Sequence, residues 1–279
     1  VVTGLGAEAG AALAAHPGLD FLTFTGSPEV GTLIQQAAAV NHIGVTLELG
    51  GKSPQIVFAD ADLDQAIPVI VNAIIQNAGQ TCSAGSRVLI ERSAFETVAV
   101  RLAERFAALV AGPWDADLDL GSLVNARQKA RVERYLARAA ADGIAVVARG
   151  RIASNAPDAG HYVAPALLGP VPRDHALAHE EVFGPVLSLI PFEDEADAIA
   201  LANGTPYGLV AGVWTRDGQR AVRIGRKVRA GQVFLNAYGA GGGVELPFGG
   251  FKKSGHGREK GFEALLHFTA PKTLVIKHG

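Results

Sequence analysis

The sequence is poor in sulfur, since its 279 residues include one cysteine, Cys82, and no methionine. A single cysteine excludes an intrachain disulfide, and no basic N-terminus leads into an apolar signal segment, so we expect a reducing, cytoplasmic setting. Long apolar runs are also missing. The most apolar one, residues 66–78, is interrupted by Pro68, Asn72 and Gln76, so no stretch reaches the length of a membrane span.

An excess of one charge is lacking as well. The 25 Lys and Arg residues are mixed along the chain with 27 Asp and Glu residues, for a formal net charge of -2. Such a balance provides neither a basic face for nucleic acid nor a polybasic membrane patch. Hydrophobic residues make up 48% of the chain, enough for a sizeable core. We therefore expect a globular protein that binds neither nucleic acid nor a membrane surface.

The chain begins Val1-Val2-Thr3-Gly4, without an initial methionine. We interpret residues 1–3 as strand and residues 4–10 as a glycine turn that leads into a helix. The Gly-x-Gly-x-x-Ala spacing fits a dinucleotide-binding turn, but no acidic residue ends a strand about 20 positions later, which favours a plain turn. A parallel sheet normally has earlier strands. We expect the later portion of a longer protein, or of a gene that lost its front.

Strand and helix patterns alternate along the chain, which predicts an α/β fold with a parallel sheet. The expected strands are 20–24, 45–49, 55–58, 87–91, 186–191, 209–215 and 232–236, and the expected helices are 28–40, 62–78, 93–111, 128–142, 195–203 and 218–228. Helix 28–40 carries Val30, Leu33, Ile34 and Ala37 on one face. Residues 150–160 are interpreted as a surface loop, and residues 273–277 as a strand that needs a partner sheet from a neighbouring domain or another subunit.

The segment 77–87 holds Cys82 among small and polar neighbours, where Gly79, Ala84 and Gly85 leave room for an approaching group. Cys82 can be interpreted as a nucleophilic thiol or as an inert buried thiol, and a lone cysteine by itself favours the inert interpretation.

Two strand ends are also candidate sites. Ser27 is a candidate N-cap, with Pro28 at the first helical position, and this helix end is equally an anion site or a plain cap. Glu48 ends a strand next to Gly50-Gly51, where open α/β sheets place ligands. The alternative is a solvated polar face of an edge strand.

Two long loops complete the candidates. Residues 179–185 pair two carboxylates with an aromatic ahead of a buried strand, although a charged strand entry is common. Residues 238–257 form a long loop with spaced Phe residues, a length that favours function or disorder.

Together, five motifs match the order and spacing of the NAD(P)-dependent aldehyde dehydrogenase superfamily, which the chain resembles over its whole length. They are Phe24-Thr25-Gly26-Ser27, Leu47-Glu48-Leu49-Gly50-Gly51-Lys52-Ser53-Pro54, Gly79-Gln80-Thr81-Cys82, Glu181-Val182-Phe183-Gly184-Pro185 and Pro247-Phe248-Gly249-Gly250.

The resemblance implies a reaction in which an aldehyde is oxidised to a carboxylic acid with NAD or NADP. Cys82 matches the catalytic thiol, which forms a thiohemiacetal and then a thioester, and Glu48 matches the general base. Other family positions are matched as follows: Glu181 and Phe183 for the nicotinamide ribose, Gly26 and Ser27 for the pyrophosphate, Leu49 for the nicotinamide, and Asn236 and Phe248 for the substrate pocket.

The resemblance also implies a domain plan. Residues 1–49 resemble the end of a partial Rossmann-like cofactor domain, 50–252 the catalytic domain, 253–267 a return to the cofactor domain, and 268–279 an oligomerisation strand that joins a homodimer or homotetramer. The matched part lacks the family's oxyanion asparagine and adenosine-ribose lysine. Removing an oxyanion donor costs roughly 3 kcal/mol of transition-state stabilisation, so we expect these 279 residues alone to turn over slowly. Because part of the nucleotide site is also missing, we expect them to bind NAD poorly. The alternatives are a thioester or ester hydrolase that uses the same cysteine, and an inactive truncated remnant.

Overall fold

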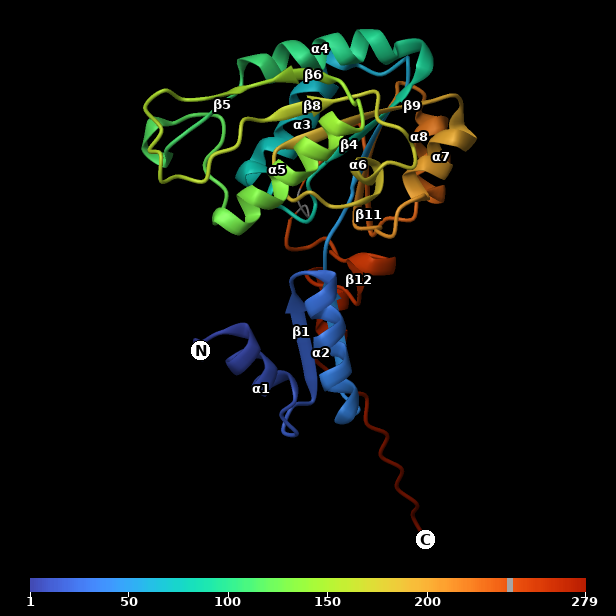
Figure 1. Ribbon diagram of the computed structural model, residues 1–279. Helices are drawn as coiled ribbons and strands as arrows, with labels where there is room; N and C mark the ends of the chain where they lie inside the picture. Colours follow the sequence, from blue (N-terminus) through green and yellow to red (C-terminus); the bar gives the residue numbers. More distant parts are fainter. Residues whose placement is uncertain (240–242) are drawn as a thin grey trace.

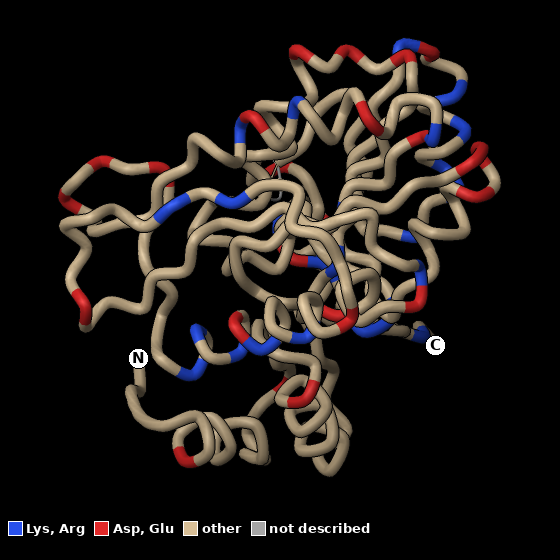
Figure 2. Tube along the Cα trace, turned by 45° about the horizontal axis from the view of Figure 1, so that its top comes forward, with Lys and Arg blue, Asp and Glu red and all other residues tan. Residues whose placement is uncertain are grey.

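The computed structural model describes residues 1–239 and 243–279, so the predicted loop 238–257 lies partly outside the described residues. The chain forms a large unit and a smaller one, which contains both the first helices and the return of the chain near its end (Figure 1). Acidic and basic residues are interspersed over the large unit, whereas residues 1–49 of the small unit include acidic residues but no Lys or Arg (Figure 2).

The large unit is built on a seven-stranded sheet with the strand order β11-β10-β3-β4-β9-β8-β6. Neighbouring strands are parallel except for β6 and β8, which are antiparallel. The strands are β3 (Pro54–Val57), β4 (Arg87–Glu91), β6 (Val146–Arg149), β8 (Ala166–Leu168), β9 (Val186–Phe192), β10 (Val210–Trp214) and β11 (Gln232–Leu235). A short parallel pair, β5 (Val110–Ala111) and β7 (Arg151–Ile152), lies beside it.

Helices cover both faces of this sheet. Because side chains alternate along a strand, Leu89 of β4 joins one core, whereas Val88 and Ile90 join the other. The first core includes residues of α5 (Ala126–Ala141), α6 (Ala176–His179), α7 (Glu195–Asn203) and α8 (Gly218–Lys227), and the second includes residues of α3 (Leu63–Ile75) and α4 (Phe95–Ala108). Side-chain caps fix several helix starts: those of α3, α5, α7 and α8 are capped by Asp62, Asn125, Asp194 and Asp217.

The small unit has a three-stranded sheet with the order β1-β2-β12. The first two strands are parallel, and β12 returns from the far end of the chain to pair antiparallel with β2. Its elements are a π-helix (Gly6–Gly10), α1 (Ala11–Ala14), β1 (Phe21–Thr25), α2 (Pro28–Val40), β2 (Gly44–Glu48), β12 (Gly255–His256) and α9 (Gly261–His267). Short 3-10 helices span Gln76–Gly79, Arg92–Ala94, Trp114–Ala116 and Lys252–Ser254.

The prediction of an α/β fold is confirmed, but several local predictions are wrong. Residues 1–3 form no strand, and the helix predicted to reach residue 111 ends at Ala108, after which β5 begins. β6 was not predicted, and β7 lies inside the predicted loop 150–160. Such short strands depend on pairing with distant segments rather than on their own pattern.

The buried face of α2 also differs from the prediction. Val30 and Leu33 are 42% and 63% exposed, and the helix buries Gly31 and Ala38 instead. A Cβ atom added at Gly31 would lie 2.7 Å from a methyl carbon of Leu49. The absence of a side chain at Gly31 therefore lets α2 approach the end of β2 closely.

Residues 268–279 form neither helix nor strand in this chain, and they are exposed. A strand there remains a prediction for the assembled protein. Within residues 1–239 and 243–279, no helix has both the length and the apolar character needed to cross a membrane.

Candidate active site

The two units meet where β2 leads into β3, and the intervening residues Leu49–Ser53 are all buried. Glu48 lies at the carboxyl end of β2. Cys82 precedes β4, and Glu181 and Phe183 precede β9. Because β3, β4 and β9 are adjacent and parallel, their amino ends lie along one edge of the large sheet. The carboxyl end of the small sheet thus meets the amino edge of the large one, and the candidate residues gather there.

A sharp turn delivers the cysteine to this edge. Asn77, Ala78 and Gly79 follow α3 with φ values of 51°, 53° and 74°, the left-handed region, which is costly for residues other than glycine. A Cβ atom added at Gly79 would lie 2.3 Å from the carbonyl carbon of Gly184. Because Gly79 has no side chain, its backbone packs directly against the loop before β9. The sequence predicted only that it leaves space near the cysteine.

Cys82 is half-buried, and two carboxylates lie within electrostatic reach of it. Burial raises the pKa of the thiol to about 11, and the negative charges of Glu181 and Glu48 act in the same direction. The cysteine is therefore a protonated thiol at neutral pH and needs a base to become nucleophilic.

Glu48 is 2% exposed, and neither carboxylate oxygen forms a hydrogen bond within the described residues. Burial raises its pKa to about 8; the charge of Glu259 raises it further and Arg258 opposes the shift. A Cβ atom added at Gly249 would lie 2.8 Å from Glu48 Oε1, so the glycine pair near the end of the chain packs on this carboxylate. The solvated edge-strand interpretation is wrong, and a carboxylate that titrates near neutrality suits general acid-base chemistry.

Glu181 is fixed against the linker between the units. Its Oε1 accepts a hydrogen bond of 2.9 Å from the Gly51 N–H, and burial raises its pKa. Helix α5 holds the backbone of the same loop: Arg131 donates to the Glu181 carbonyl at 2.6 Å, and Gln128 donates to the Phe183 carbonyl at 2.7 Å. These bonds hold Phe183 at a φ of 60°. Sequence reasoning missed Gln128 and Arg131, because their helix showed only an amphipathic pattern.

The expected cofactor residues surround the end of β2. The Gly26 N–H donates to the Glu48 carbonyl at 3.0 Å, and the Ser27 hydroxyl caps α2 by accepting from the Val30 N–H at 3.4 Å. The Glu29 backbone N–H and the Ser27 hydroxyl lower the pKa of the Glu29 carboxyl. The polar groups at this helix end therefore favour a negatively charged group there.

An open pocket of about 290 Å³ lies beside the same helix start. It is lined by Pro28, Glu29, Thr32, Gln35, Leu47, Leu49, Lys252, Lys253, Gly255 and His256. Leu49, one of the expected cofactor residues, therefore lines open space next to this helix start. These residues fit a dinucleotide by the chemistry of their donors. No group of three or more His, Cys, Asp or Glu residues suited to a metal ion occurs in the part of the chain that the structure describes.

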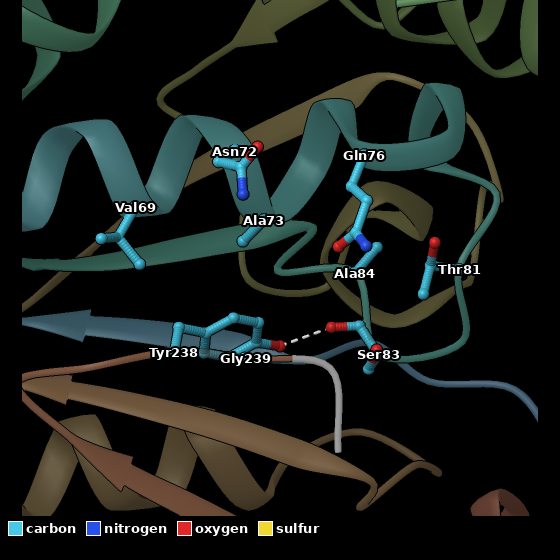
Figure 3. A pocket seen from close by; sticks show the side chains of 9 residues that line it. All are labelled: Val69, Asn72, Ala73, Gln76, Thr81, Ser83, Ala84, Tyr238 and Gly239. Atoms are coloured by element: carbon cyan, nitrogen blue, oxygen red, sulfur yellow. Dashed lines mark hydrogen bonds between the residues drawn. The ribbon is translucent and has the colours of Figure 1, made fainter. Parts of the chain in front are cut away.

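The two expected pocket residues, Asn236 and Phe248, are held by contacts with residues outside the cysteine segment. The Asn236 amide is engaged with the Thr215 backbone, accepting at 3.0 Å and donating at 2.9 Å. Phe248 pairs through its backbone with Glu259, and its ring lies 5.6 Å from the Lys260 ammonium. Tyr238, which sequence reasoning missed, does reach the cysteine segment, since its hydroxyl donates to the Ser83 carbonyl at 2.6 Å (Figure 3). An aromatic at the start of the glycine-rich loop was its only signal.

Comparisons with known proteins agree with the motif pattern. A profile of the aldehyde dehydrogenase family matches residues 1–274. The chain is 42% identical to (Z)-2-((N-methylformamido)methylene)-5-hydroxybutyrolactone dehydrogenase of Acinetobacter baylyi, covering 99% of this chain and 56% of that protein. It is 41% identical to betaine aldehyde dehydrogenase 1 of Rhizobium meliloti, covering 97% of this chain and 55% of that protein. The chain therefore spans little more than half the length of these relatives.

Solved structures give the same result. A crystal structure from Burkholderia cenocepacia, provisionally named an aldehyde dehydrogenase, has a TM-score of 0.97 and 65% identity, covering 100% of this chain and 58% of that one. Betaine aldehyde dehydrogenase of Staphylococcus aureus, solved in complex with NAD+, has a TM-score of 0.90 and 35% identity, covering 95% of this chain and 52% of that one.

Proposed function

Because the chain belongs to the aldehyde dehydrogenase family, we propose that it supplies the thiol and the base with which a longer protein oxidises an aldehyde to a carboxylic acid. The observation that carries this proposal is the half-buried thiol of Cys82 within electrostatic reach of the buried carboxylate of Glu48 and the half-buried carboxylate of Glu181. NAD or NADP is the proposed oxidant. Glu181 and Phe183 would hold its nicotinamide ribose, Gly26 and Ser27 its pyrophosphate, and Leu49 its nicotinamide.

The first step belongs to Cys82. Its sulfur forms a bond to the aldehyde carbon while Glu48 takes the thiol proton, and the carbonyl oxygen becomes the hydroxyl of a thiohemiacetal after protonation. A bound nicotinamide would supply the oxidation by taking the hydrogen of that carbon as hydride, and the thiohemiacetal hydroxyl would lose its proton to the surrounding water to give the thioester. Glu48 then removes a proton from the water that attacks the thioester, and the carboxylic acid and the Cys82 thiol are released.

The raised pKa values give this sequence of steps a pH dependence. Glu48, with a pKa of about 8, is mostly protonated at pH 7 and becomes a competent base as the pH rises. We therefore expect the steps that use it to become faster between pH 7 and 9.

Two further parts of the proposal concern the assembled protein. Residues 268–279 would form the strand that joins a homodimer or homotetramer, because Leu274, Val275 and Ile276 are apolar and exposed. The proposed location is the cytoplasm, since a thiol nucleophile has to stay reduced.

Two variants test the function. In the longer protein that contains these residues, we expect Cys82→Ser to abolish NAD(P)H formation from aldehydes, and Glu48→Gln to slow release of the acid so that an acyl group accumulates on Cys82. Absorbance of NAD(P)H and mass spectrometry of the intact protein measure these outcomes, with Gln219→Leu on an exposed part of α8 as the control. Full activity in Cys82→Ser would overturn the assignment. Ester hydrolysis by Cys82 with no nucleotide present, and no oxidation when it is added, would favour the hydrolase instead.

A second measurement tests the coupling between base and thiol without turnover. Because the Glu48 charge raises the pKa of Cys82, Glu48→Gln lowers that pKa. Above pH 8 we expect iodoacetamide to alkylate Cys82 faster in this variant than in the wild type. Below pH 8 the two rates converge, because Glu48 is then mostly protonated. Equal rates at pH 9 would show that the carboxylate and the thiol do not interact.

A further inference from the structure

The loop that carries Glu181 is preceded by the one-turn helix α6, which lies beside α5 (Figure 1). Four residues are too few to form a stable helix on their own. Ala176, Leu177 and Ala178 are buried, so packing fixes one side of this helix. Its two ends have to be fixed by polar contacts, and the direction of the following residues depends on them.

His175 holds the first end of α6. Its Nδ1 accepts a hydrogen bond of 3.1 Å from the Leu177 N–H, which caps the helix, and its Nε2 lies 3.0 Å from Asp142 Oδ2. Because Nδ1 accepts, the imidazole proton is on Nε2, which donates to the carboxylate. The His175 side chain is 8% exposed, and Asp142 is the C-cap residue of α5. One imidazole therefore joins the start of α6 to the end of α5.

Tyr135 holds the second end. Its hydroxyl donates to Glu180 Oε2 at 2.7 Å, and Glu180 is the C-cap residue of α6. Burial raises the pKa of Tyr135 to about 12, and the hydrogen bond to Glu180 acts in the same direction, so the hydroxyl keeps its proton at neutral pH. The next residue is Glu181, whose Oε1 accepts from the Gly51 N–H at 2.9 Å. The place where α6 ends therefore sets where the Glu181 carboxylate lies.

The side chains of α5 that hold this segment share one face of the helix. Gln128, Arg131, Tyr135 and Asp142 follow one another at intervals of 3, 4 and 7 residues, the spacing of a single stripe. Gln128 and Arg131 hold backbone carbonyls after α6, whereas Tyr135 and Asp142 hold side chains at its two ends. Helix α5 therefore binds residues 175–183 along their whole length.

Resting on the function proposed above, we propose that His175 and Tyr135 are positioning residues, which fix the two ends of α6 and thereby hold the Glu181 carboxylate against the linker, where it would receive the nicotinamide ribose. Neither residue takes part in the chemical steps. Loss of either hydrogen bond frees one end of α6 and lets the Glu181 carboxylate move away from the Gly51 N–H.

Cys82 reports the position of this carboxylate without cofactor or turnover. The negative charge of Glu181 raises the pKa of the thiol, so a carboxylate that moves away lowers that pKa. A fall of half a unit raises the thiolate fraction about threefold. Alkylation of Cys82 by iodoacetamide between pH 8 and 10, followed by mass spectrometry of the intact protein, measures this change. We expect Tyr135→Phe and His175→Ala to react about threefold faster than the wild type, and Glu181→Gln to react fastest.

Double variants separate positioning from a general loss of structure. If His175 and Tyr135 act through Glu181, their substitutions should add nothing in a Glu181→Gln background. His175→Asn, which retains a capping side chain, should recover part of the wild-type rate. Tyr162→Phe, on the segment before β8, is the matched control and should react as the wild type does.

Amide hydrogen exchange at Gly51 is the second readout, because its N–H donates to Glu181, and it should accelerate in Tyr135→Phe and His175→Ala. Circular dichroism checks that each variant folds. Wild-type values of either measurement in both single variants, or a rate increase that persists in full without the Glu181 charge, would overturn this inference and leave the proposed function standing. Aldehyde oxidation by the Cys82→Ser variant of the longer protein would instead contradict the proposed function.

Discussion

The large and small units are both α/β structures with parallel strands, yet they differ in how they bury their side chains. Central residues of the large sheet such as Ile56, Leu89 and Ile190 are fully buried, with helices on both faces. In the small unit, β1 has no buried residue, and α2 buries only Gly31 and Ala38. The same architecture thus forms a closed core in one unit and an open one in the other.

Burial in the small sheet is concentrated where it meets the large unit. Gly44, at the start of β2, is exposed, whereas Thr46, Leu47 and Glu48 at its end are 2–3% exposed. The candidate base is therefore carried by the open unit but desolvated at the contact with the closed one. The basicity of Glu48 thus depends on the contact between the units.

The largest expected effect separates the two cores directly. Phe106 of α4 is fully buried in the large unit, so Phe106→Ala should destabilise the protein by about 3–5 kcal/mol. The matched change Leu33→Ala, at a residue 63% exposed in the small unit, should cost less than about 0.5 kcal/mol. Urea unfolding followed by circular dichroism measures both, because each unit contains helices. A cost above 2 kcal/mol for Leu33→Ala would show that the small unit has a closed core after all.

The next effect concerns the buried base. Between pH 4.5 and about 8 the unfolded chain releases the Glu48 proton while the folded protein keeps it, so stability falls across this window. Glu48→Gln removes that loss, and at pH 9 it should stabilise the protein by on the order of 3 kcal/mol. The difference should vanish near pH 4. Urea unfolding at pH 4, 7 and 9, followed by circular dichroism, provides the measurement.

A lysine in the linker serves as a control, because its pKa shift makes stability rise with pH instead of fall. Lys52 is buried, its ammonium forms no hydrogen bond within residues 1–239 and 243–279, and burial lowers its pKa from 10.5 to about 7. The unfolded chain keeps this proton between pH 7 and 10.5, so stability rises over that window. Lys52→Met should therefore stabilise most at or below pH 7. If both variants showed the same pH dependence, desolvation at the junction would not be the cause.

A smaller effect is expected at the junction itself. The fully buried Ser254 donates to the Gly50 carbonyl at 2.7 Å and accepts from the Gly208 N–H at 3.0 Å. Ser254→Ala leaves both partners unpaired and should cost about 1–3 kcal/mol. Amide hydrogen exchange should accelerate at Gly208. The exposed Ser93→Ala is the control, and equal exchange rates in the two variants would mean that Ser254 does not link the units.

The smallest effect lies on the open side of the small sheet. The exposed Thr23 of β1 donates to Glu259 Oε1 at 3.0 Å. Because water competes for both groups, Thr23→Val should change stability by no more than about 0.5 kcal/mol, measured by the same urea titration. A loss above 1 kcal/mol would show that this hydrogen bond is shielded from water.

The sequence predicts elements with local signals and misses those that depend on distant partners. Helices α2 and α7 have their predicted bounds, because Ser27 and Asp194 cap their first turns. The two-residue strands β5 and β7 carry no comparable signal, since they exist only through pairing with each other.

The same distinction applies to the site. The motifs select Cys82 and Glu48, but the alternation along β2 leaves the exposure of Glu48 undecided. Its burial follows from the packing of Gly249, about 200 residues away, a separation over which no local pattern extends. Gln128, Arg131 and Tyr238 were missed because their roles are hydrogen bonds to backbone groups of distant loops.

The lone cysteine has a consequence for oxidative damage. In proteins with many methionines, these residues react with part of the peroxide. This chain has no methionine, so Cys82 carries its only sulfur atom. Oxidation of a thiol proceeds through the thiolate, and the high pKa of Cys82 keeps that form scarce. Protonation at rest therefore protects the sulfur from peroxide. Deprotonation, which makes the sulfur nucleophilic, also exposes it to irreversible oxidation. Because the chain contains one sulfur atom, the amount of oxygen added to sulfur measures the fraction of oxidised active sites directly.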